Sequence, residues 1–450
     1  MRRKITDEFL KWKNEDQGRT VLLVEGARRV GKSYIVEDFA RTHYKSYVLI
    51  DFMVASPQIK QLFEDHLGDL DAFFARLSLL THKELFKRDT LIIFDEIQMF
   101  PRARAALKYL VADGRYDYME TGSLLSIRKN TSQIVIPSEE KHIQLNPMDF
   151  EEYLWARNDD VTMKIIRSCH EEKKPLGQAA HREVMKRFRE YLLIGGMPQV
   201  VNAFTDTNDF MKAEDAKRMI LDLYRDDIAK YAEGYKEKVR AIFDEVPHSL
   251  ARHDLSFKLA AIDKNARMRD YESAFFWLKD AMICNMCYLS TEPNIGLGIN
   301  AERLRLKPYV ADTGLLVSMM FDETGLADRA IYEKILYDKL EVNLGIVMEN
   351  VVAQMFTASG RKLYYYASSD NVDKDNRMEI DFLIRKRNLT NRHNIVPVEV
   401  KSTSHYRTVS LKKFVEKFQN YSATPVIIHT GDYMVKGGME CFPIYMTGLI

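Results

Sequence analysis

Residues 26–33 carry the pattern whose chemistry is most specific. They read GARRVGKS, which fits G-x-x-x-x-G-K-[ST], and they lie between an apolar run typical of a strand and apolar residues at helical spacing. Glycines let the backbone N–H groups of such a loop turn toward phosphate oxygens. Lys32 would reach the β and γ phosphates, and the Ser33 hydroxyl would complete a Mg²⁺ shell. The motif predicts a site for ATP and Mg²⁺; the alternative is a glycine turn that binds nothing.

Two acids close a second apolar run, LIIFDE. A carboxylate at the end of a buried strand is costly unless a cation lies beside it. Asp95 suits the Mg²⁺ shell, and Glu96 suits the polarising of the attacking water. Alone the pattern is weak, because many strands end in solvated acids, but downstream of GARRVGKS it indicates nucleotide hydrolysis.

A third strand end, in YDYMETGS, offers two hydroxyl groups that could hold the water or the γ-phosphate. The alternative is a plain polar strand terminus. The residues expected at the nucleotide are Gly26, Ala27, Arg28, Arg29, Val30, Gly31, Lys32, Ser33, Tyr34, Asp95, Glu96, Thr121 and Ser123.

The last part of the chain holds a different set of charged residues: Glu349, Asp381, and the pair Glu399 and Lys401 in VPVEVKS. Residues at i and i+2 share one face of a strand, so the pair would lie together while the valines face the core. If the three carboxylates converge, their repulsion would favour a divalent cation, Mg²⁺ or Mn²⁺, held by Asp381 and Glu399. Lys401 would then steady the charge that builds on a phosphodiester. The alternative is surface acids paired with Arg385, Lys386 and Arg387.

Three further patterns favour structural interpretations. Cys284 and Cys287 lack a second C-x-x-C or paired histidines, so we expect core cysteines and no zinc site. The stretch ERLRLK, with Arg303, Arg305 and Lys307, could be a wing on a phosphate backbone but is more typical of a solvated strand face. Arg225 could reach a neighbouring subunit's nucleotide, yet a helix-surface ion pair is the commoner arrangement.

The composition limits the classes that remain. The 450 residues include 46% hydrophobic and 29% charged residues and carry a net charge of +1, which excludes disordered chains and uniformly basic nucleic-acid coats. Four scattered cysteines favour a reducing compartment, and we expect the cytoplasm. The apolar runs are far shorter than the roughly 20 residues that span a bilayer, so no membrane segment is expected.

The elements that must position these residues predict an α/β protein. Residues 1–158 alternate strands and helices as a P-loop parallel-sheet domain does. Residues 159–240 are helical, and the helix-then-hairpin order of 241–328 suits a winged-helix-like module. Residues 329–450 return to alternation and predict a second α/β domain.

The motifs together resemble prokaryotic AAA-type ATPases whose C-terminal domain has a PD-(D/E)xK nuclease-like fold. The resemblance rests on GARRVGKS, IIFDEIQ, ETGS, LNPMDFEEYLWA, YLLIGGMPQVV, ADTGLL, GIVMENVVAQ, EIDFLI and VPVEVKS in this order. It implies an ATPase core, a helical and winged-helix middle and a restriction-endonuclease-like C-terminal domain. It gives Lys32, Ser33, Asp95 and Glu96 the nucleotide roles, and Glu349, Asp381, Glu399 and Lys401 the nuclease-like ones. Arg29 stands where this group often has Gln.

The preferred hypothesis is an ATP-dependent switch or motor that acts on DNA and has a metal-dependent nuclease-like C-terminal domain. Further copies of the chain, in a homo-oligomer, are another candidate partner. One alternative keeps the ATPase but makes the C-terminal fold a module that binds DNA or protein without cutting. Another is a signalling ATPase whose nucleotide state gates partner binding.

Overall fold

The computed structural model describes residues 1–122, 138–321, 332, 344–368, 377–403 and 406–450. It separates into two compact units, Met1–Asn146 and Pro147–Ile450. Ser123, expected at the nucleotide, lies outside the described residues.

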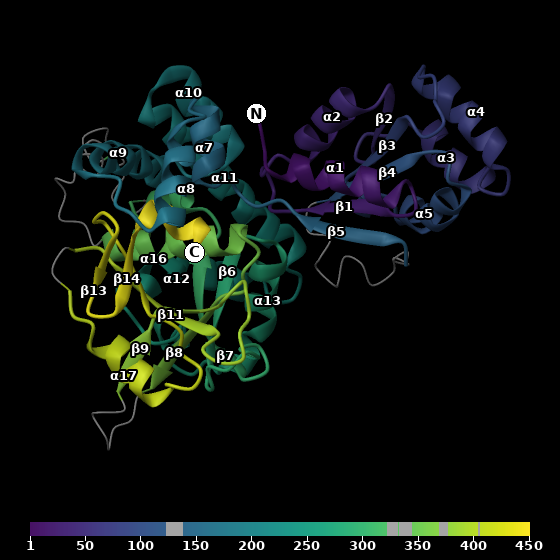
Figure 1. Ribbon diagram of the computed structural model, residues 1–450. Helices are drawn as coiled ribbons and strands as arrows, with labels where there is room; N and C mark the ends of the chain where they lie inside the picture. Colours follow the sequence, from purple (N-terminus) through teal and green to yellow (C-terminus); the bar gives the residue numbers. More distant parts are fainter. Residues whose placement is uncertain (123–137, 322–331, 333–343, 369–376, 404–405) are drawn as a thin grey trace. The chain divides into compact units, whose positions relative to one another are not determined.

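The first unit is built on a parallel five-stranded sheet in the order β2-β3-β4-β1-β5, which can be followed in Figure 1. This confirms the expected α/β parallel-sheet domain. The elements are α1 (Ile5–Asp16), β1 (Val21–Glu25), α2 (Lys32–His43), β2 (Ser46–Asp51), α3 (Pro57–Asp65), α4 (Leu70–Thr81), β3 (Thr90–Asp95), α5 (Pro101–Asp113), β4 (Asp117–Gly122) and β5 (Glu140–Gln144).

Both faces of this sheet are covered, because successive strand residues point to opposite sides. Val21 and Leu23 pack with residues of α3, α4 and α5. Leu22 and Val24 pack with residues of α1 and α2. Strands buried on both faces need apolar residues at almost every position, which explains the continuous runs TVLLV and TLIIF.

The second unit begins with helices and continues into two sheets. Its helices are α7 (Phe150–Ala156), α8 (Thr162–Glu172), α9 (Gln178–Ile194), α10 (Pro198–Thr207), α11 (Phe210–Tyr231), α12 (Lys236–Ala251), α13 (Glu272–Asp280), α14 (Thr313–Met320), α16 (Leu344–Ala358) and α17 (Val409–Lys417). Its strands are β6 (Cys284–Ser290), β7 (Ala301–Val310), β8 (Tyr364–Ser368), β9 (Met378–Ile380), β10 (Phe382–Arg385), β11 (Ile395–Lys401), β12 (Val426–His429), β13 (Met434–Lys436) and β14 (Met439–Pro443).

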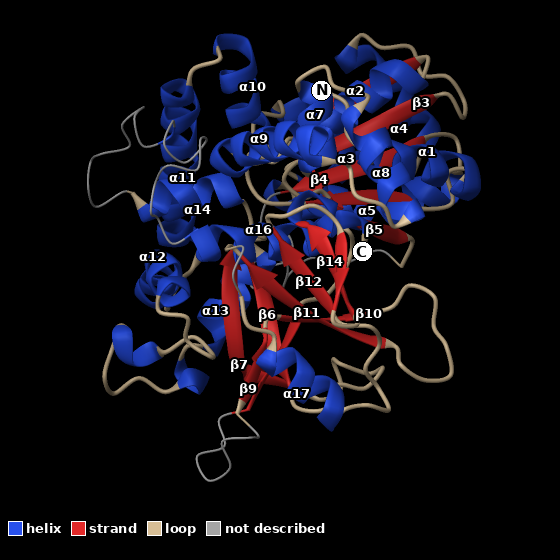
Figure 2. Ribbon diagram, turned by 60° about the vertical axis from the view of Figure 1, so that its left-hand side comes forward, coloured by secondary structure: helices blue, strands red, loops and turns tan. Residues whose placement is uncertain are grey.

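These strands form the sheets β10-β11-β12-β14-β13 and β7-β6-β8-β9. In Figure 2 the strands β10, β11, β12 and β14 lie side by side. The hairpin of β6 and β7, expected in a separate winged-helix-like module, instead shares a sheet with β8 and β9 from the C-terminal stretch. The sequence of β6 explains this, because its residues are mostly buried and a strand so enclosed needs neighbours at both edges.

The stretch MEIDFLIR, expected as one strand, is divided at Asp381. β9 pairs with β8, whereas β10 pairs with β11. The Asp381 carboxylate accepts a hydrogen bond from the N–H of Val400 at 2.8 Å. Val400 lies beyond the last residue pair of β10 and β11, which is Phe382 with Val398. One carboxylate therefore lies where the chain passes from one sheet to the other.

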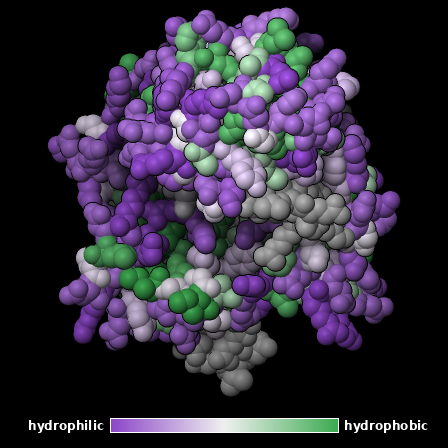
Figure 3. Space-filling view, turned by 90° about the vertical axis from the view of Figure 1, so that its right-hand side faces the viewer, coloured by the Kyte–Doolittle hydropathy of each residue, from purple (hydrophilic) through white to green (hydrophobic). Residues whose placement is uncertain are grey.

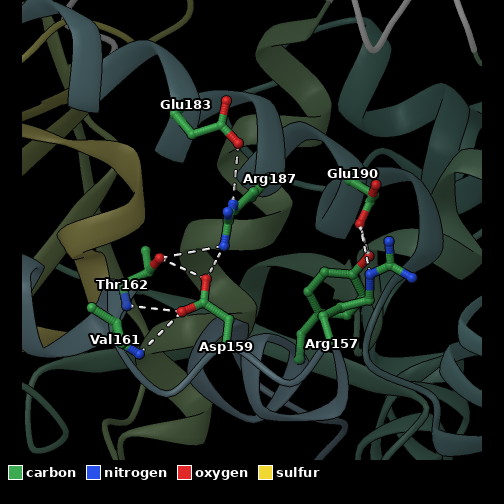
Figure 4. Close-up of polar contacts among 8 residues, drawn as sticks. Arg157, Asp159, Val161, Thr162, Glu183, Arg187 and Glu190 are labelled. Carbon is green, nitrogen blue, oxygen red and sulfur yellow. Dashed lines mark hydrogen bonds and ion pairs between the residues drawn. The ribbon is translucent and has the colours of Figure 1, made fainter.

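Asp159 fixes the start of α8 against α9. Its carboxylate accepts hydrogen bonds from the N–H of Val161 at 3.1 Å and of Thr162 at 2.9 Å. Figure 4 shows Arg187 of α9 reaching the same carboxylate and, at 3.3 Å, Glu183 one turn earlier. The N–H groups at the start of α8, which have no partner within the helix, thus donate to the Asp159 carboxylate, and Arg187 neutralises its charge.

No helix among the described residues is long and apolar enough to cross a membrane. On the face shown in Figure 3, polar residues predominate and apolar residues form small separate groups.

Asp312 joins α14 to the turn between α9 and α10. It is 1% exposed, and its oxygens accept from the N–H of Gly196 at 2.6 Å and of Leu315 at 3.0 Å. Gly195 has φ +80°, and a Cβ there would lie 2.2 Å from an Asp312 oxygen. The paired glycines therefore let the chain close around a buried carboxylate.

We predict that Asp312→Asn destabilises the protein by about 1 to 3 kcal/mol at pH 4, because both oxygens of the protonated acid can accept an N–H, whereas the amide nitrogen of Asn can only donate. Burial raises the pKa of Asp312 to about 6. A raised pKa contributes stability that is present below the ordinary value near 3.8 and is lost as the pH rises through 6. The amide does not titrate, so the difference in the free energy of unfolding between parent and variant should become smaller as the pH rises over this range. Urea unfolding between pH 4 and pH 7 measures it, and a pH-independent gap would contradict the assignment.

Candidate functional site

The loop of residues 26–33 connects β1 to α2, which begins at Lys32. Its backbone is tightly constrained: Arg29 has φ +68° and Gly31 has φ +95°. A Cβ on Gly26 would lie 2.6 Å from the carbonyl oxygen of Leu145. Glycine is therefore required at residue 26 by space and at residue 31 by conformation.

Lys32 closes the loop upon itself. Its ammonium group donates to the carbonyl oxygens of Gly26 at 2.9 Å and Ala27 at 3.0 Å, and the residue is only 6% exposed. Phosphate oxygens are stronger acceptors for an ammonium group than neutral carbonyls are, so the position of Lys32 suits an anion.

Asp95 is the point at which three strand-end and helix-start residues meet. One of its oxygens accepts the Ser33 hydroxyl at 2.9 Å and also the Thr121 hydroxyl. β4 lies between β1 and β3 in the sheet, so the carboxyl ends of neighbouring parallel strands bring these residues together. Hydroxyl and carboxylate oxygens are the ligands that Mg²⁺ prefers, and the set fits that ion.

Glu96 follows β3 in a left-handed conformation, φ +49°. Such a backbone is uncommon for a residue with a side chain and marks a constrained position. Gln98 donates to its carboxylate at 2.5 Å. The other loop residues differ in exposure: Ala27 and Val30 are buried, Arg28 is half-buried, and Arg29 and Tyr34 are exposed.

A buried ion network beside Thr121 was not anticipated from the sequence. Glu120 is fully buried, 3.8 Å from the guanidinium of Arg104, which also binds Glu140 at 2.6 and 3.0 Å. Burial and the neighbouring Glu140 raise the pKa of Glu120 well above its ordinary range. Although burial opposes it, hydrogen bonds from His142 and Arg104 lower the pKa of Glu140 to about 2. Arg104 lies on the apolar face of α5. A charged residue at such a position is the feature of the sequence that could have predicted this network.

Two of the three acids expected in the last part of the chain, Glu349 and Asp381, line a common cavity of about 340 Å³ in the second unit. Glu349 reaches it from α16, Asp381 from the corner between β9 and β10, and Lys401 from the end of β11. Two residues not assigned to this site from the sequence, Lys307 of β7 and Glu379 of β9, also line it.

Glu399 lies behind this cavity. It is 3% exposed, and its oxygen lies 2.7 Å from the Lys401 ammonium, as alternation along the strand predicts. Burial raises the pKa of Glu399 to about 7 even though Lys401 opposes the rise. Val398 is fully buried on the other face. The two residues therefore form a buried ion pair, with Glu399 directed at Lys401.

Glu349, in the wall of the cavity, also has a displaced pKa. Burial and the neighbouring Asp381 raise the pKa of Glu349 to about 8, and the Tyr309 hydroxyl donates to it at 3.3 Å. Burial and the nearby carboxylate therefore favour its neutral form. In the described part of the chain, no three His, Cys, Asp or Glu side chains are arranged to hold a metal ion, so as arranged these residues do not fit a second divalent cation.

The structural interpretations of the remaining patterns agree with the structure. Cys284 and Cys287 are buried and unbridged in β6. Arg225 lies 3.5 Å from Asp222 and 3.4 Å from Asp244. Lys307 differs from its expected place on a solvated strand face, because it is 7% exposed and directed into the cavity.

Three family models match separate parts of the chain. Residues 18–154 match an AAA domain, residues 185–328 match a Domain of unknown function (DUF8612), and residues 344–446 match a Domain of unknown function (DUF4143). No curated protein matches the sequence. The AAA match, with the loop geometry described above, supports an ATPase of the AAA P-loop type in the first unit.

Several solved structures are similar over much of the chain. The Walker-type ATPase PABY2304 of Pyrococcus abyssi is 13% identical, with a TM-score of 0.41 over 71% of this chain and 95% of that one. The Aeropyrum pernix ORC1 protein in complex with DNA is 10% identical, with a TM-score of 0.28 over 75% and 93%. AMPPCP-bound DnaA from Aquifex aeolicus is 12% identical, with a TM-score of 0.27 over 62% and 86%. Likenesses this distant carry no argument about function.

Proposed function

We propose that this chain binds and hydrolyses ATP and uses the nucleotide cycle as a switch or motor on DNA. The observation that carries the ATPase part is the meeting of Ser33 and Thr121 at the Asp95 carboxylate, beside the loop that Lys32 closes. Hydroxyl, carboxylate and ammonium groups brought together in this way support a site for a nucleoside triphosphate.

Lys32 is held by two neutral carbonyl oxygens, and phosphate oxygens are stronger acceptors for an ammonium group. The β and γ phosphates would therefore replace the carbonyls of Gly26 and Ala27. Ser33 and Asp95 would hold Mg²⁺, which when bound supplies positive charge to the transferring phosphoryl group. Thr121 also donates to the Asp95 carboxylate, at the same oxygen as Ser33.

Glu96 is the residue placed to orient the attacking water and accept its proton. Its carboxylate follows the metal-binding acid directly, and the Gln98 amide restricts its orientation. A group that acts in this way must be positioned first and have a suitable pKa second. The constrained backbone at Glu96 supports the positioning role.

Substitution of Lys32 and Glu96 separates binding from chemistry. We predict that Lys32→Ala weakens ATP binding at least about tenfold and abolishes turnover, because the ammonium group is lost. Glu96→Gln should bind ATP with unchanged affinity and lose turnover about a hundredfold or more, because size and polarity remain but the base is gone. Calorimetric binding and phosphate release, with the exposed Lys11→Ala of α1 as control, measure both. Parental turnover in either variant would contradict its assigned role.

For the second unit, the geometry favours the alternative in which the nuclease-like region binds DNA without cutting it. The cavity acids are accompanied by two lysines, and burial raises the pKa of Glu349. Exposed Arg303 and half-buried Arg305 lie on the same strand as Lys307 and supply positive charge suited to a phosphate backbone. Metal-dependent cleavage remains the competing hypothesis for this domain.

An assay on labelled duplex, branched and single-stranded DNA tests this proposal. With Mg²⁺ or Mn²⁺, with and without ATP, we predict DNA binding and no strand cleavage above that of Glu399→Ala. DNA should also accelerate ATP hydrolysis. Metal-dependent cleavage that disappears in Glu399→Ala would instead establish the nuclease hypothesis.

A further inference from the structure

Lys307 is the least expected charged residue of the second unit. Its strand, β7, pairs with β6, and Lys307 lies opposite the buried Cys287. The side chain is 7% exposed, and its ammonium lies 5.1 Å from the centre of the Tyr365 ring. A lysine this deeply buried is rare unless acids hold it in place.

Three carboxyl groups surround the Lys307 ammonium. Glu379 lies 2.5 Å away, and Glu349 and Asp381 line the same cavity. Although burial opposes the charge, the attraction of Glu379, Glu349 and Asp381 raises the pKa of Lys307 above its ordinary range. These acids therefore favour the charged form of Lys307.

The other cavity cation has a partner of its own. Lys401 lies 2.7 Å from the buried Glu399, which is not among the cavity-lining residues. The remaining acid of the cavity wall, Asp254, is held by Lys258 and, at 3.2 Å, by Arg252. Lys307 is thus the cation that contacts Glu379, and Glu349 and Asp381 also attract it.

We propose that Lys307 takes the place of a divalent cation, so that this cavity is a metal site closed by the chain's own ammonium group. A carboxylate cluster of this kind attracts a cation, and a divalent ion entering beside Lys307 would meet a like charge in a poorly solvated space. This explains why acids that converge as the sequence predicts do not present a ligand set. The inference rests on the proposed non-cleaving role of the second unit and gives its cause.

The test is the affinity of the full chain for Mn²⁺, measured by calorimetry without nucleotide. Lys307→Met keeps an unbranched apolar stem and removes the charge, and it should bind Mn²⁺ at least tenfold more tightly than the parent. Arg305→Met is the matched control, because Arg305 lies two residues away on the same strand and contacts only the surface acid Glu302, at 3.7 Å, among its ion pairs in the described chain. Its Mn²⁺ affinity should equal that of the parent. The gain should disappear in Lys307→Met with Asp381→Asn, which locates the ion.

Lys307→Met leaves Glu379 without its ion-pair partner and could unfold the protein. Lys307→Met with Glu379→Gln removes both charges of the pair and should also bind Mn²⁺ more tightly than the parent. Equal Mn²⁺ affinity in the parent and in the folded Lys307 variants, whether all bind or none binds, would overturn the inference.

DNA binding of the parent in chelator, followed by fluorescence anisotropy, separates this inference from the proposed function. Absence of DNA binding would overturn the proposed function and leave the Mn²⁺ result to decide on Lys307. Mn²⁺-dependent cleavage by the parent would overturn both.

Discussion

A carboxylate withdrawn from water needs a cation or hydrogen-bond donors at its oxygens, and both units of this chain are organised by that requirement. Asp95 receives two hydroxyl groups, Asp312 receives two backbone N–H groups, and Glu399 faces a lysine. Each of these acids lies at the end of a strand or the start of a helix. The local fold therefore depends on which groups donate to each carboxylate. Whether the donor is a hydroxyl, a backbone N–H or an ammonium group decides what else that carboxylate can bind.

The two sites differ in what satisfies their acids. At Asp95 the partners are neutral hydroxyls, so the carboxylate keeps its full negative charge for an incoming metal ion. In the second unit the partners of Glu379, in the cavity wall, and of Glu399, behind the cavity, are ammonium groups, which already cancel their charge. The same residue type at the same kind of strand end thus supports nucleotide chemistry in one unit and a closed, lysine-filled cavity in the other.

Local pattern was enough to predict that the residues of the proposed nucleotide site lie together. Gly26, Lys32 and Ser33 are close in sequence, and Asp95 ends a strand whose apolar run is continuous, so parallel-sheet geometry places it beside them. Alternation likewise predicted that Glu399 and Lys401 share a face. These arguments need only the period of a strand and the direction of a sheet.

The partners that come from distant strands could not be predicted in this way. Lys307 reaches Glu379 because β6 pairs with β7 on one edge and with β8 on the other, and this pairing depends on long-range packing. Arg104 of α5 likewise contacts Glu140 of β5 in the first unit. The division of MEIDFLIR at Asp381 depends on a hydrogen bond to Val400, which no period in the sequence reveals.

The most direct test of the account is a crystal structure of the chain with Mg²⁺ and a non-hydrolysable ATP analogue. The account predicts that the Lys32 ammonium leaves the carbonyls of Gly26 and Ala27 for the β and γ phosphates. It also predicts that Mg²⁺ lies between Ser33 and Asp95. An analogue bound elsewhere, or a Lys32 that still contacts both carbonyls with the analogue present, would contradict it.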